Sequence, residues 1–399
     1  MTTTSVLVVG ASLGGLTVVE ALRREGFSGS VTLLGAERHL PYDRPPLSKR
    51  VLLSAMEPSQ TQLRPQSTLD QLHAELVLSD PAVCLDASRH EVKTASGRVL
   101  AADVIVLATG LVPRKLSGQD GLSGVYVLRT LDDALALKSA LVPGKKLVVV
   151  GDGVLGTEIA ATACSLGLAV TLVGPQSLPM RSQLGPLVGS CLGTLHSLRG
   201  VNLRLGTGVA SLRSDSSVVT GVCLQSGEEL SADLVVVAMG SLPATDWLAG
   251  SGLQIADGVV CDSRLRAAPN IYAVGDVARF SHEKLGSLVR LENRTNAVEQ
   301  GLCVAANILG TDTPYLPVPY FWTDQFDVKI QVHGFVSADA EAVVVEGDPA
   351  SGPFVVLYGS QGKVTGLCGW NAVRQIRQHR AHVMDGTAWQ TIREQFPTK

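Results

Sequence analysis

Two glycine-rich turns carry the clearest chemical signal in this 399-residue sequence. The first lies in SVLVVGASLGGLTVVEALRREG and the second, in mid-chain, in KLVVVGDGVLGTEIAATACSLG. In each, an apolar run leads into closely spaced glycines and then an amphipathic stretch, which is typical of a strand, a tight turn and a helix. Such a turn brings backbone N–H groups and a helix N-terminus to the pyrophosphate of a dinucleotide. The sequence therefore predicts two dinucleotide sites.

The glycines of the second turn have separate expected tasks. Gly151 permits the tight turn, Gly153 lets backbone N–H groups approach the pyrophosphate, and Gly156 lets the helix pack close to the strand. One such pattern alone is a weak signal, since any tight strand-to-helix turn can produce it. Its repetition in the same strand and helix context argues against that simpler explanation.

The first turn differs in one position. It contains Gly10, Ser12, Gly14 and Gly15, so a serine replaces the middle glycine. Serine is small enough for such a turn, and its hydroxyl can donate a hydrogen bond to a phosphate.

Further segments repeat between the two units. Each helix is followed by a second β-branched run, SVTLLGAERHLP or AVTLVGPQSLPM, and DVIVLATG has its counterpart in DLVVVAMG, which ends at Gly240. Continuous apolar strands between helices predict parallel sheets covered on both faces. The segment NIYAVGDVARF places Asp276 at the end of another strand, where it either binds sugar or ribityl hydroxyls or caps a helix.

The repeat predicts an α/β fold with two Rossmann-like dinucleotide-binding domains, the second inserted into the first. The first comprises residues 1–111 and 242–316, and the inserted domain comprises residues 112–241. After a proline-rich linker at 314–319, we expect a C-terminal α+β domain over 317–399, with antiparallel strands and then a helix from about Asn371.

Composition narrows the class of protein. The net charge of −3 and pI near 6.2 give no global reason to expect a nucleic acid or an anionic membrane as partner. We expect a cytoplasmic protein, because the N-terminus lacks the pattern of a signal peptide and no apolar run is long enough to span a bilayer. The seven cysteines are scattered and form no C-x-x-C pair, so neither a metal site nor a disulfide framework is expected.

Beyond the glycine turns, the chain contains HLPYDRPPLSKR, ATGLVPRKL, VLRTLDDA, YAVGDVARF, RLENRTNAVEQG and FWTDQF in this order. In these motifs it closely resembles the FAD-dependent ferredoxin reductases of the putidaredoxin and rhodocoxin reductase type, over essentially the whole chain. The resemblance implies non-covalent FAD in the first domain and a nicotinamide nucleotide in the inserted one. It also implies hydride transfer from NAD(P)H to FAD and single-electron transfer to a [2Fe–2S] ferredoxin, which supplies a haem monooxygenase or ring-hydroxylating oxygenase.

Two other activities of this superfamily fit the sequence less well. A disulfide reductase needs paired cysteines in the stretch LPYDRPPLSKRVLLS, which has none, and oxidases of this superfamily usually use a single cysteine there. The alternatives that stay open are a rubredoxin reductase and a redox signalling module resembling apoptosis-inducing factor. We expect a monomer or weak homodimer.

The resemblance implies a set of FAD contacts. Glu37 would bind the adenosine ribose, although the family often has its acid one position earlier, and Lys49 would form an ion pair with Glu158 near flavin N5. Trp322 either packs beside the flavin or is a core aromatic. Arg294 replaces a tryptophan common in the family and could shift the flavin potential, stack on a ring or serve the protein partner. The implied FAD residues are Gly10, Ser12, Gly14, Glu37, Lys49, Val83, Arg129, Asp276, Arg294 and Trp322.

The expected nicotinamide site lacks one feature of the family. An acid usually follows the second strand of the inserted unit, but this chain has Gly174 there. We predict NADH, as the resemblance to the family implies, with discrimination against NADPH weakened because this acid is missing. Arg181 does not indicate NADPH, since relatives also carry arginine at this position. The implied NAD(P)H residues are Gly151, Gly153, Gly156, Glu158, Gln176, Arg181 and Gly240.

A row of arginines lies near the C-terminus. Arg374, Arg377 and Arg380 are spaced three apart in NAVRQIRQHRAH and share one face of an expected helix. They form either a docking patch for an acidic ferredoxin or an ordinary solvated face.

Overall fold

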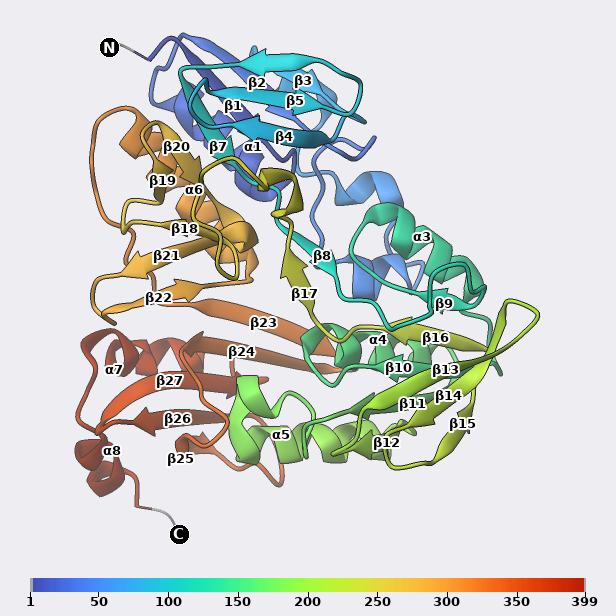
Figure 1. The fold of residues 1–399 in the computed structure, drawn as a ribbon. Helices are drawn as coiled ribbons and strands as arrows, with labels where there is room; N and C mark the ends of the chain where they lie inside the picture. Colours follow the sequence, from blue (N-terminus) through green and yellow to red (C-terminus); the bar gives the residue numbers. More distant parts are fainter. Residues whose placement is uncertain (1–2, 398–399) are drawn as a thin grey trace. The chain divides into compact units, whose positions relative to one another are not determined.

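The computed structural model describes residues 3–397, which fall into two compact units, each built from three segments of the chain (Figure 1). The first unit comprises Met1–Asp43, Ser59–Val112 and Leu242–Pro319. The second unit comprises Arg44–Pro58, Pro113–Ser241 and Tyr320–Lys399. Three elements lie where the chain passes from one unit to the other: η2 (Pro58–Thr61), β8 (Leu111–Pro113) and β17 (Ser241–Pro243).

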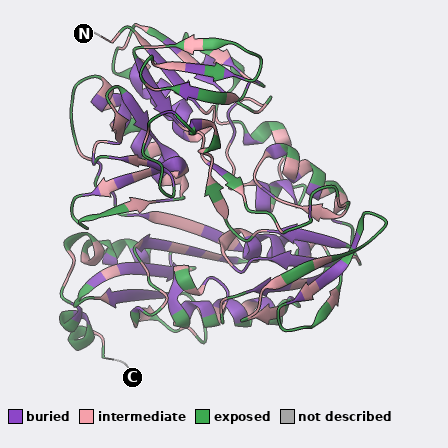
Figure 2. Cartoon of the chain, in the orientation of Figure 1, coloured by how far each residue is buried: buried purple, intermediate pink, exposed green. Residues whose placement is uncertain are grey.

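The first unit is built on a six-stranded sheet in the order β19-β20-β7-β1-β2-β3. All neighbouring strands in it pair in parallel except β19 and β20. The strands are β1 (Ser5–Val9), β2 (Ser30–Leu34), β3 (Glu75–Val77), β7 (Val104–Leu107), β19 (Arg266–Ala268) and β20 (Ile271–Ala273). The apolar runs of β1, β7 and β20 are buried, as Figure 2 shows, because parallel strands are covered on both faces.

Two helices of this unit pack on one another. They are α1 (Leu13–Arg24), which follows the first glycine turn, and α6 (Arg294–Ile308). Two small three-stranded sheets complete the unit, β4-β5-β6 and β18-β21-β22. Its other elements are α2 (Gln66–Asp70), β4 (Ala82–Asp86), β5 (Glu91–Thr94), β6 (Val99–Ala101), η3 (Asp246–Leu248), β18 (Val259–Cys261), η4 (Gly275–Val277), β21 (Ala278–His282) and β22 (Ser287–Arg290).

The second unit repeats the strand, turn and helix arrangement on a five-stranded parallel sheet in the order β12-β11-β10-β16-β9. Its elements are β9 (Val125–Tyr126), α3 (Leu131–Ala140), β10 (Lys146–Val150), α4 (Val154–Ser165), β11 (Ala169–Gly174), α5 (Arg181–Leu198), β12 (Asn202–Leu205) and β16 (Leu234–Val237). A three-stranded antiparallel sheet lies between β12 and β16 in the chain, with β13 (Val209–Asp215), β14 (Val218–Leu224) and β15 (Glu229–Ser231).

The C-terminal residues form an antiparallel sheet within the second unit, in the order β23-β24-β27-β26-β25. Its strands are β23 (Tyr320–Gln325), β24 (Val328–Gly334), β25 (Glu341–Gly347), β26 (Phe354–Ser360) and β27 (Lys363–Trp370). Apolar residues of α5 share a core with this sheet, which explains why the sheet belongs to the same unit as the second glycine turn.

The expected helix from about Asn371 is wrong in its start and type. Asn371 has a left-handed φ of 49°, so the chain turns there instead of entering a helix. A 3₁₀ helix, η5 (Gln375–His379), follows, and then come two short helices, α7 (Arg380–Asp385) and α8 (Trp389–Gln395). Within residues 3–397, no helix combines the length and apolar character that crossing a membrane requires.

Candidate dinucleotide sites

The first glycine turn joins β1 to α1 in a conformation that only glycine fits well. Gly10 has φ +126°, and a Cβ there would lie 2.2 Å from the carbonyl oxygen of Ala108. A Cβ on Gly15 would lie 2.0 Å from the carbonyl oxygen of Gly10. Gly15 therefore permits the close approach of helix and strand, a role that the sequence analysis assigned to no residue of this turn. Ser12 is the N-cap residue of α1, and its side chain makes no capping hydrogen bond.

The second turn, between β10 and α4, repeats this geometry. Gly151 has φ +124°, and its Cβ would lie 2.2 Å from the carbonyl oxygen of Ala238. A Cβ on Gly156 would lie 1.8 Å from the carbonyl oxygen of Gly151. Gly153 is different, because it has an ordinary φ of −81° and a Cβ there would meet nothing within 4 Å. The fold does not need glycine at 153, so the open space beside its backbone fits a bound pyrophosphate.

Other predicted FAD residues of the first unit lie on a loop, in a strand and at the start of a helix. Glu37 follows β2, and the Tyr42 hydroxyl donates a 2.5 Å hydrogen bond to its carboxylate. Val83 lies at a β-bulge in β4 and is 46% exposed. Arg294, at the start of α6, forms an ion pair with Asp43, with 2.8 Å between Nε and Oδ1. Its guanidinium therefore has a carboxylate partner within the same unit.

Asp276 lies in η4, immediately after Gly275, whose φ of +75° is left-handed. The backbone N–H of Gly275 donates a 2.6 Å hydrogen bond to Gln300 Oε1 on α6. Gln300 is completely buried, and its Nε2 has no hydrogen-bond partner among the residues that the structure describes. A buried donor without a partner costs stability unless something else accepts its hydrogen bond. Gln300 thus joins the candidates for holding FAD, and nothing in the glycine pattern pointed to it.

The expected ion pair between Lys49 and Glu158 is present within the second unit. Lys49 lies in the π-helical turn η1 (Leu47–Val51), and Glu158 lies in the first turns of α4. The distance between Lys49 Nζ and Glu158 Oε1 is 2.8 Å, and the side chains are 15% and 6% exposed. The hydroxyls of Ser48 and Thr323 donate hydrogen bonds of 2.5 and 2.7 Å to the same carboxylate. Glu158 is therefore a buried, charged and fully oriented group.

A buried polar network extends from this pair. Gln325 Nε2 donates to the hydroxyls of Thr323 at 3.2 Å and Thr157 at 2.9 Å. Gln325 Oε1 lies 2.7 Å from Nε2 of His196, at the end of α5. Burial lowers the pKa of His196, although the bond to Gln325 opposes this, so the ring is neutral at pH 7 and donates to the amide oxygen. Strand β23 thereby fixes Thr323, which orients Glu158.

The two remaining FAD candidates of the second unit are Arg129 and Trp322. Arg129 is half-buried and precedes Thr130, the N-cap residue of α3. Trp322 stacks on Tyr320 with ring centroids 6.0 Å apart. The neighbouring Phe321 packs in the apolar core, and Trp322 points to the opposite face of β23.

The predicted nicotinamide residues beyond the turn also lie in the second unit. Gln176 follows β11, and its backbone and side-chain N–H groups donate to Asp152. Arg181 begins α5, and its guanidinium forms an exposed ion pair with Asp339. Gly240 follows β16 and has φ +91°. A Cβ there would lie 4.0 Å from the side chain of Arg114. Asp152, between the first two glycines of the turn, was not among the predicted residues.

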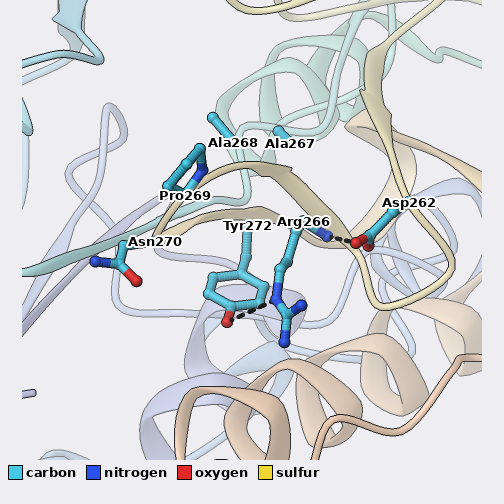
Figure 3. Close-up of a pocket in the computed structure, with 7 residues that line it drawn as sticks. All are labelled: Asp262, Arg266, Ala267, Ala268, Pro269, Asn270 and Tyr272. Atoms are coloured by element: carbon cyan, nitrogen blue, oxygen red, sulfur yellow. Dashed lines mark hydrogen bonds between the residues drawn. The ribbon is translucent and has the colours of Figure 1, made fainter.

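A surface depression in the first unit is lined by other residues than these sites. It is lined by Asp262, Arg266, Asn270 and Tyr272 near the hairpin of β19 and β20 (Figure 3). Arg266 donates hydrogen bonds to Asp262 and to the Tyr272 hydroxyl. None of the predicted dinucleotide residues lines this depression.

All seven cysteines are free thiols. Burial raises the pKa of Cys368 to about 12 and also raises that of Cys261. These two thiols are therefore protonated at neutral pH, which argues against disulfide chemistry at either position.

Comparison with known proteins agrees with the geometry. Residues 4–301 match the family model of the pyridine nucleotide-disulphide oxidoreductases, and residues 320–393 match the model described as reductase C-terminal. Rhodocoxin reductase of Rhodococcus erythropolis is 37% identical over 94% of this chain and 88% of its own length. A solved ferredoxin reductase from Rhodopseudomonas palustris superposes with a TM-score of 0.91 at 34% identity, covering 94% of this chain and 93% of that one.

A second solved structure, the covalent complex of putidaredoxin reductase with putidaredoxin, also superposes with a TM-score of 0.91. It is 31% identical and covers 96% of this chain and 93% of that one. These similarities extend over both glycine turns and the C-terminal sheet. The chain therefore belongs to the pyridine nucleotide-disulphide oxidoreductase family and, within it, to the FAD-dependent ferredoxin reductases of the rhodocoxin and putidaredoxin reductase type.

Proposed function

We propose that this chain takes electrons from NADH and delivers them singly to a [2Fe–2S] ferredoxin, which supplies a haem monooxygenase or ring-hydroxylating oxygenase. The observation that carries this proposal is the presence of two glycine turns of matching geometry, each on its own parallel sheet. Two such turns suit a protein that holds one dinucleotide permanently and exchanges the other. Similarity to reductases over 94% of the chain supports the choice of acceptor.

FAD supplies the step from a two-electron donor to one-electron acceptors, and the protein supplies binding, orientation and charge. We propose that the turn at Gly10 and Ser12 holds the FAD pyrophosphate and that Glu37 binds its adenosine ribose. Val83, Asp276 and Arg294 are proposed to complete the FAD contacts of the first unit. The open space beside Gly153 supports the same role for the second turn with NADH.

Lys49 and Glu158 are proposed to act electrostatically. Lys49 keeps a positive charge where negative charge develops during hydride transfer, as preorganised donors do in other active sites. The 2.8 Å ion pair to Glu158 fixes the position of that charge. We also propose that Arg129 and Trp322 contact FAD. No side chain is needed as a nucleophile or a general base.

We propose the domain assignment that the sequence predicts: an FAD-binding domain over 1–111 and 242–316, an NAD(P)H-binding domain over 112–241 and a third domain over 317–399. Unit boundaries at 112/113, 241/242 and 319/320 support the positions of the domain boundaries. The segment Arg44–Pro58, which contains Lys49, groups with the second unit. We further propose a cytoplasmic location and a monomer or weak homodimer.

The test is steady-state turnover with a [2Fe–2S] ferredoxin and cytochrome c as terminal acceptor. Sustained NADH-dependent reduction at about ten per second or more, typical of enzymes, supports the proposal. Rubredoxin serves as the comparison acceptor. Faster electron transfer to rubredoxin than to ferredoxin would identify the protein as a rubredoxin reductase. Flavin reduction without electron transfer to either protein would favour a redox signalling module.

The arginine row is proposed as the ferredoxin docking patch. Arg374, Arg377 and Arg380 are exposed, and the structure gives none of them an ion pair among the residues it describes. Arg377 lies in the 3₁₀ helix η5, and Arg374 and Arg380 flank it.

The double substitution Arg374→Glu and Arg377→Glu should lower kcat/KM for ferredoxin about tenfold at low salt and weaken its salt dependence, because steering by opposite charge acts mainly on association. NADH-dependent ferricyanide reduction should stay unchanged. The control is Lys93→Glu with Lys284→Glu, which changes the net charge equally at two exposed lysines of the first unit. Equal effects of the two double variants would show that net charge, not this patch, matters.

A further inference from the structure

The absence of an acid at Gly174, the last residue of β11, has a structural explanation in the second glycine turn. A Cβ on Gly174 would lie 2.2 Å from both Cγ and Oδ2 of Asp152. The side chain of Asp152 therefore occupies the space that an acidic side chain at 174 would enter first. Asp152 is 4% exposed and lies between Gly151 and Gly153.

The carboxylate of Asp152 is held firmly in this position. Its Oδ2 accepts a 2.8 Å hydrogen bond from the backbone N–H of Gln176, and its Oδ1 accepts a 2.9 Å hydrogen bond from Gln176 Nε2. Gln176 Oε1 in turn accepts a 2.8 Å hydrogen bond from the backbone N–H of Ser182. Each carboxylate oxygen can accept more than one hydrogen bond, so both retain acceptor capacity for a ligand.

The first unit supplies an internal comparison. Asp152 corresponds to Ala11 and Gly174 to Gly35, and a Cβ on Gly35 would lie 2.7 Å from Cβ of Ala11. In both units the residue after the first glycine of the turn thus lies against the glycine at the end of the second strand. This contact is a property of the repeated backbone, not an accident of one side chain.

Each unit has one carboxylate in this region, but at a different position of the motif. In the first, the turn has Ala11 and the loop after the strand has Glu37, the residue proposed for the ribose of FAD. In the second, the turn has Asp152 and the position matching Glu37 is Gln176. Because Asp152 is hydrogen-bonded to Gln176, its carboxylate lies beside the position where the first unit carries its own.

We propose that Asp152 supplies the carboxylate for the adenosine ribose of NADH, in place of the acid absent at 174, and that it makes this site prefer NADH over NADPH. The inference rests on the proposed function of the second turn as the NAD(P)H site. A carboxylate accepts hydrogen bonds from the 2′- and 3′-hydroxyls of NADH, but it repels the 2′-phosphate of NADPH. Arg181, the arginine expected nearby, is paired with Asp339.

The test measures equilibrium binding to the oxidised holoenzyme by calorimetry, using ADP-ribose and 2′-phospho-ADP-ribose as probes. The wild-type protein should bind ADP-ribose more tightly than 2′-phospho-ADP-ribose. Asp152→Ala should weaken ADP-ribose binding at least tenfold, equivalent to about 1.4 kcal/mol, without weakening binding of the phosphorylated probe. The ratio of kcat/KM for NADH and NADPH, with ferricyanide as acceptor, should fall in parallel.

A second variant distinguishes recognition from loop support. Asp152→Ala with Gln176→Glu gives the second unit the pair found in the first, Ala11 and Glu37, and should restore at least part of the preference for ADP-ribose. Asp152→Asn keeps the shape of the side chain, removes its charge, and should also reduce the preference. Asp233→Ala is the control, because Asp233 likewise accepts a backbone hydrogen bond, from Lys146 at the other end of β10.

Equal weakening of both probes in Asp152→Ala, without recovery in the double variant, would show that Asp152 only supports the loop. An unchanged preference in Asp152→Ala and Asp152→Asn would also overturn the inference. In both cases wild type still binds ADP-ribose, and the proposed function stands. Wild type that binds neither probe would instead contradict the proposed function itself, and the inference would fall with it.

Discussion

Replacing Lys49 with methionine should lower the free energy of unfolding by about 3–5 kcal/mol, the usual cost of removing one partner from a buried ion pair. The carboxylate of Glu158 is 6% exposed and would lose its cationic partner while staying desolvated. The hydrogen bonds from Ser48 and Thr323 offset part of this cost but cannot neutralise the charge. Urea unfolding of the holoenzyme measures the effect.

The matched variants are Glu158→Gln and the double variant Lys49→Met with Glu158→Gln. The double variant removes both charges and should recover most of the stability lost in Lys49→Met, giving a coupling energy of about 1 kcal/mol or more. Additive losses would show that the pair contributes nothing as a pair. If the proposed role near the flavin holds, Lys49→Met should also slow NADH-dependent flavin reduction about 100-fold, as loss of other preorganised charge donors does.

Gly156→Ala should destabilise the second unit by about 1–3 kcal/mol or more and abolish productive NADH binding, because it forces α4 away from β10. The added methyl group would lie 1.8 Å from the carbonyl oxygen of Gly151, and backbone atoms cannot move aside as a flexible side chain can. The measurements are the thermal midpoint and the rate of flavin reduction by NADH in rapid mixing.

Gly153→Ala is the matched variant, because it separates an effect on NADH binding from an effect on packing. Its methyl group would meet no protein atom within 4 Å, and φ at 153 suits alanine. Stability and flavin content should therefore stay at the wild-type level, while NADH affinity falls because the methyl group fills the space proposed for the pyrophosphate. Wild-type NADH affinity in Gly153→Ala would mean that the phosphates bind elsewhere.

The two glycine turns could be predicted from sequence because both periodicity and glycine spacing are local properties. The inserted dinucleotide-binding domain could also be predicted, because its strand, turn and helix pattern repeats that of the first domain in the sequence. The packing role of Gly15 is harder to predict, because Ser12 replaces the middle glycine of the motif. Comparison of Gly15 with Gly156 as sixth residues of their motifs supplies the missing signal.

Contacts between distant segments could not be predicted in the same way. Thr323, Gln325 and His196 meet near Glu158 only after β23 and α5 have packed within the second unit. Asp152 occupies the second position of the glycine motif, which the motif does not specify. Its proposed role follows from its proximity to Gly174, which lies 22 residues later in the sequence. Side-chain proximity of this kind follows from tertiary packing and has no periodic signature.

The proposed electron path is tested most directly by anaerobic titration of the purified holoenzyme with NADH. The account predicts that the protein is yellow, that its visible flavin absorption bleaches with one equivalent of NADH, and that adding oxidised [2Fe–2S] ferredoxin restores the flavin absorption while the ferredoxin becomes reduced. A protein that carries flavin but does not bleach with NADH or NADPH, or whose bleached flavin leaves ferredoxin oxidised, would contradict it.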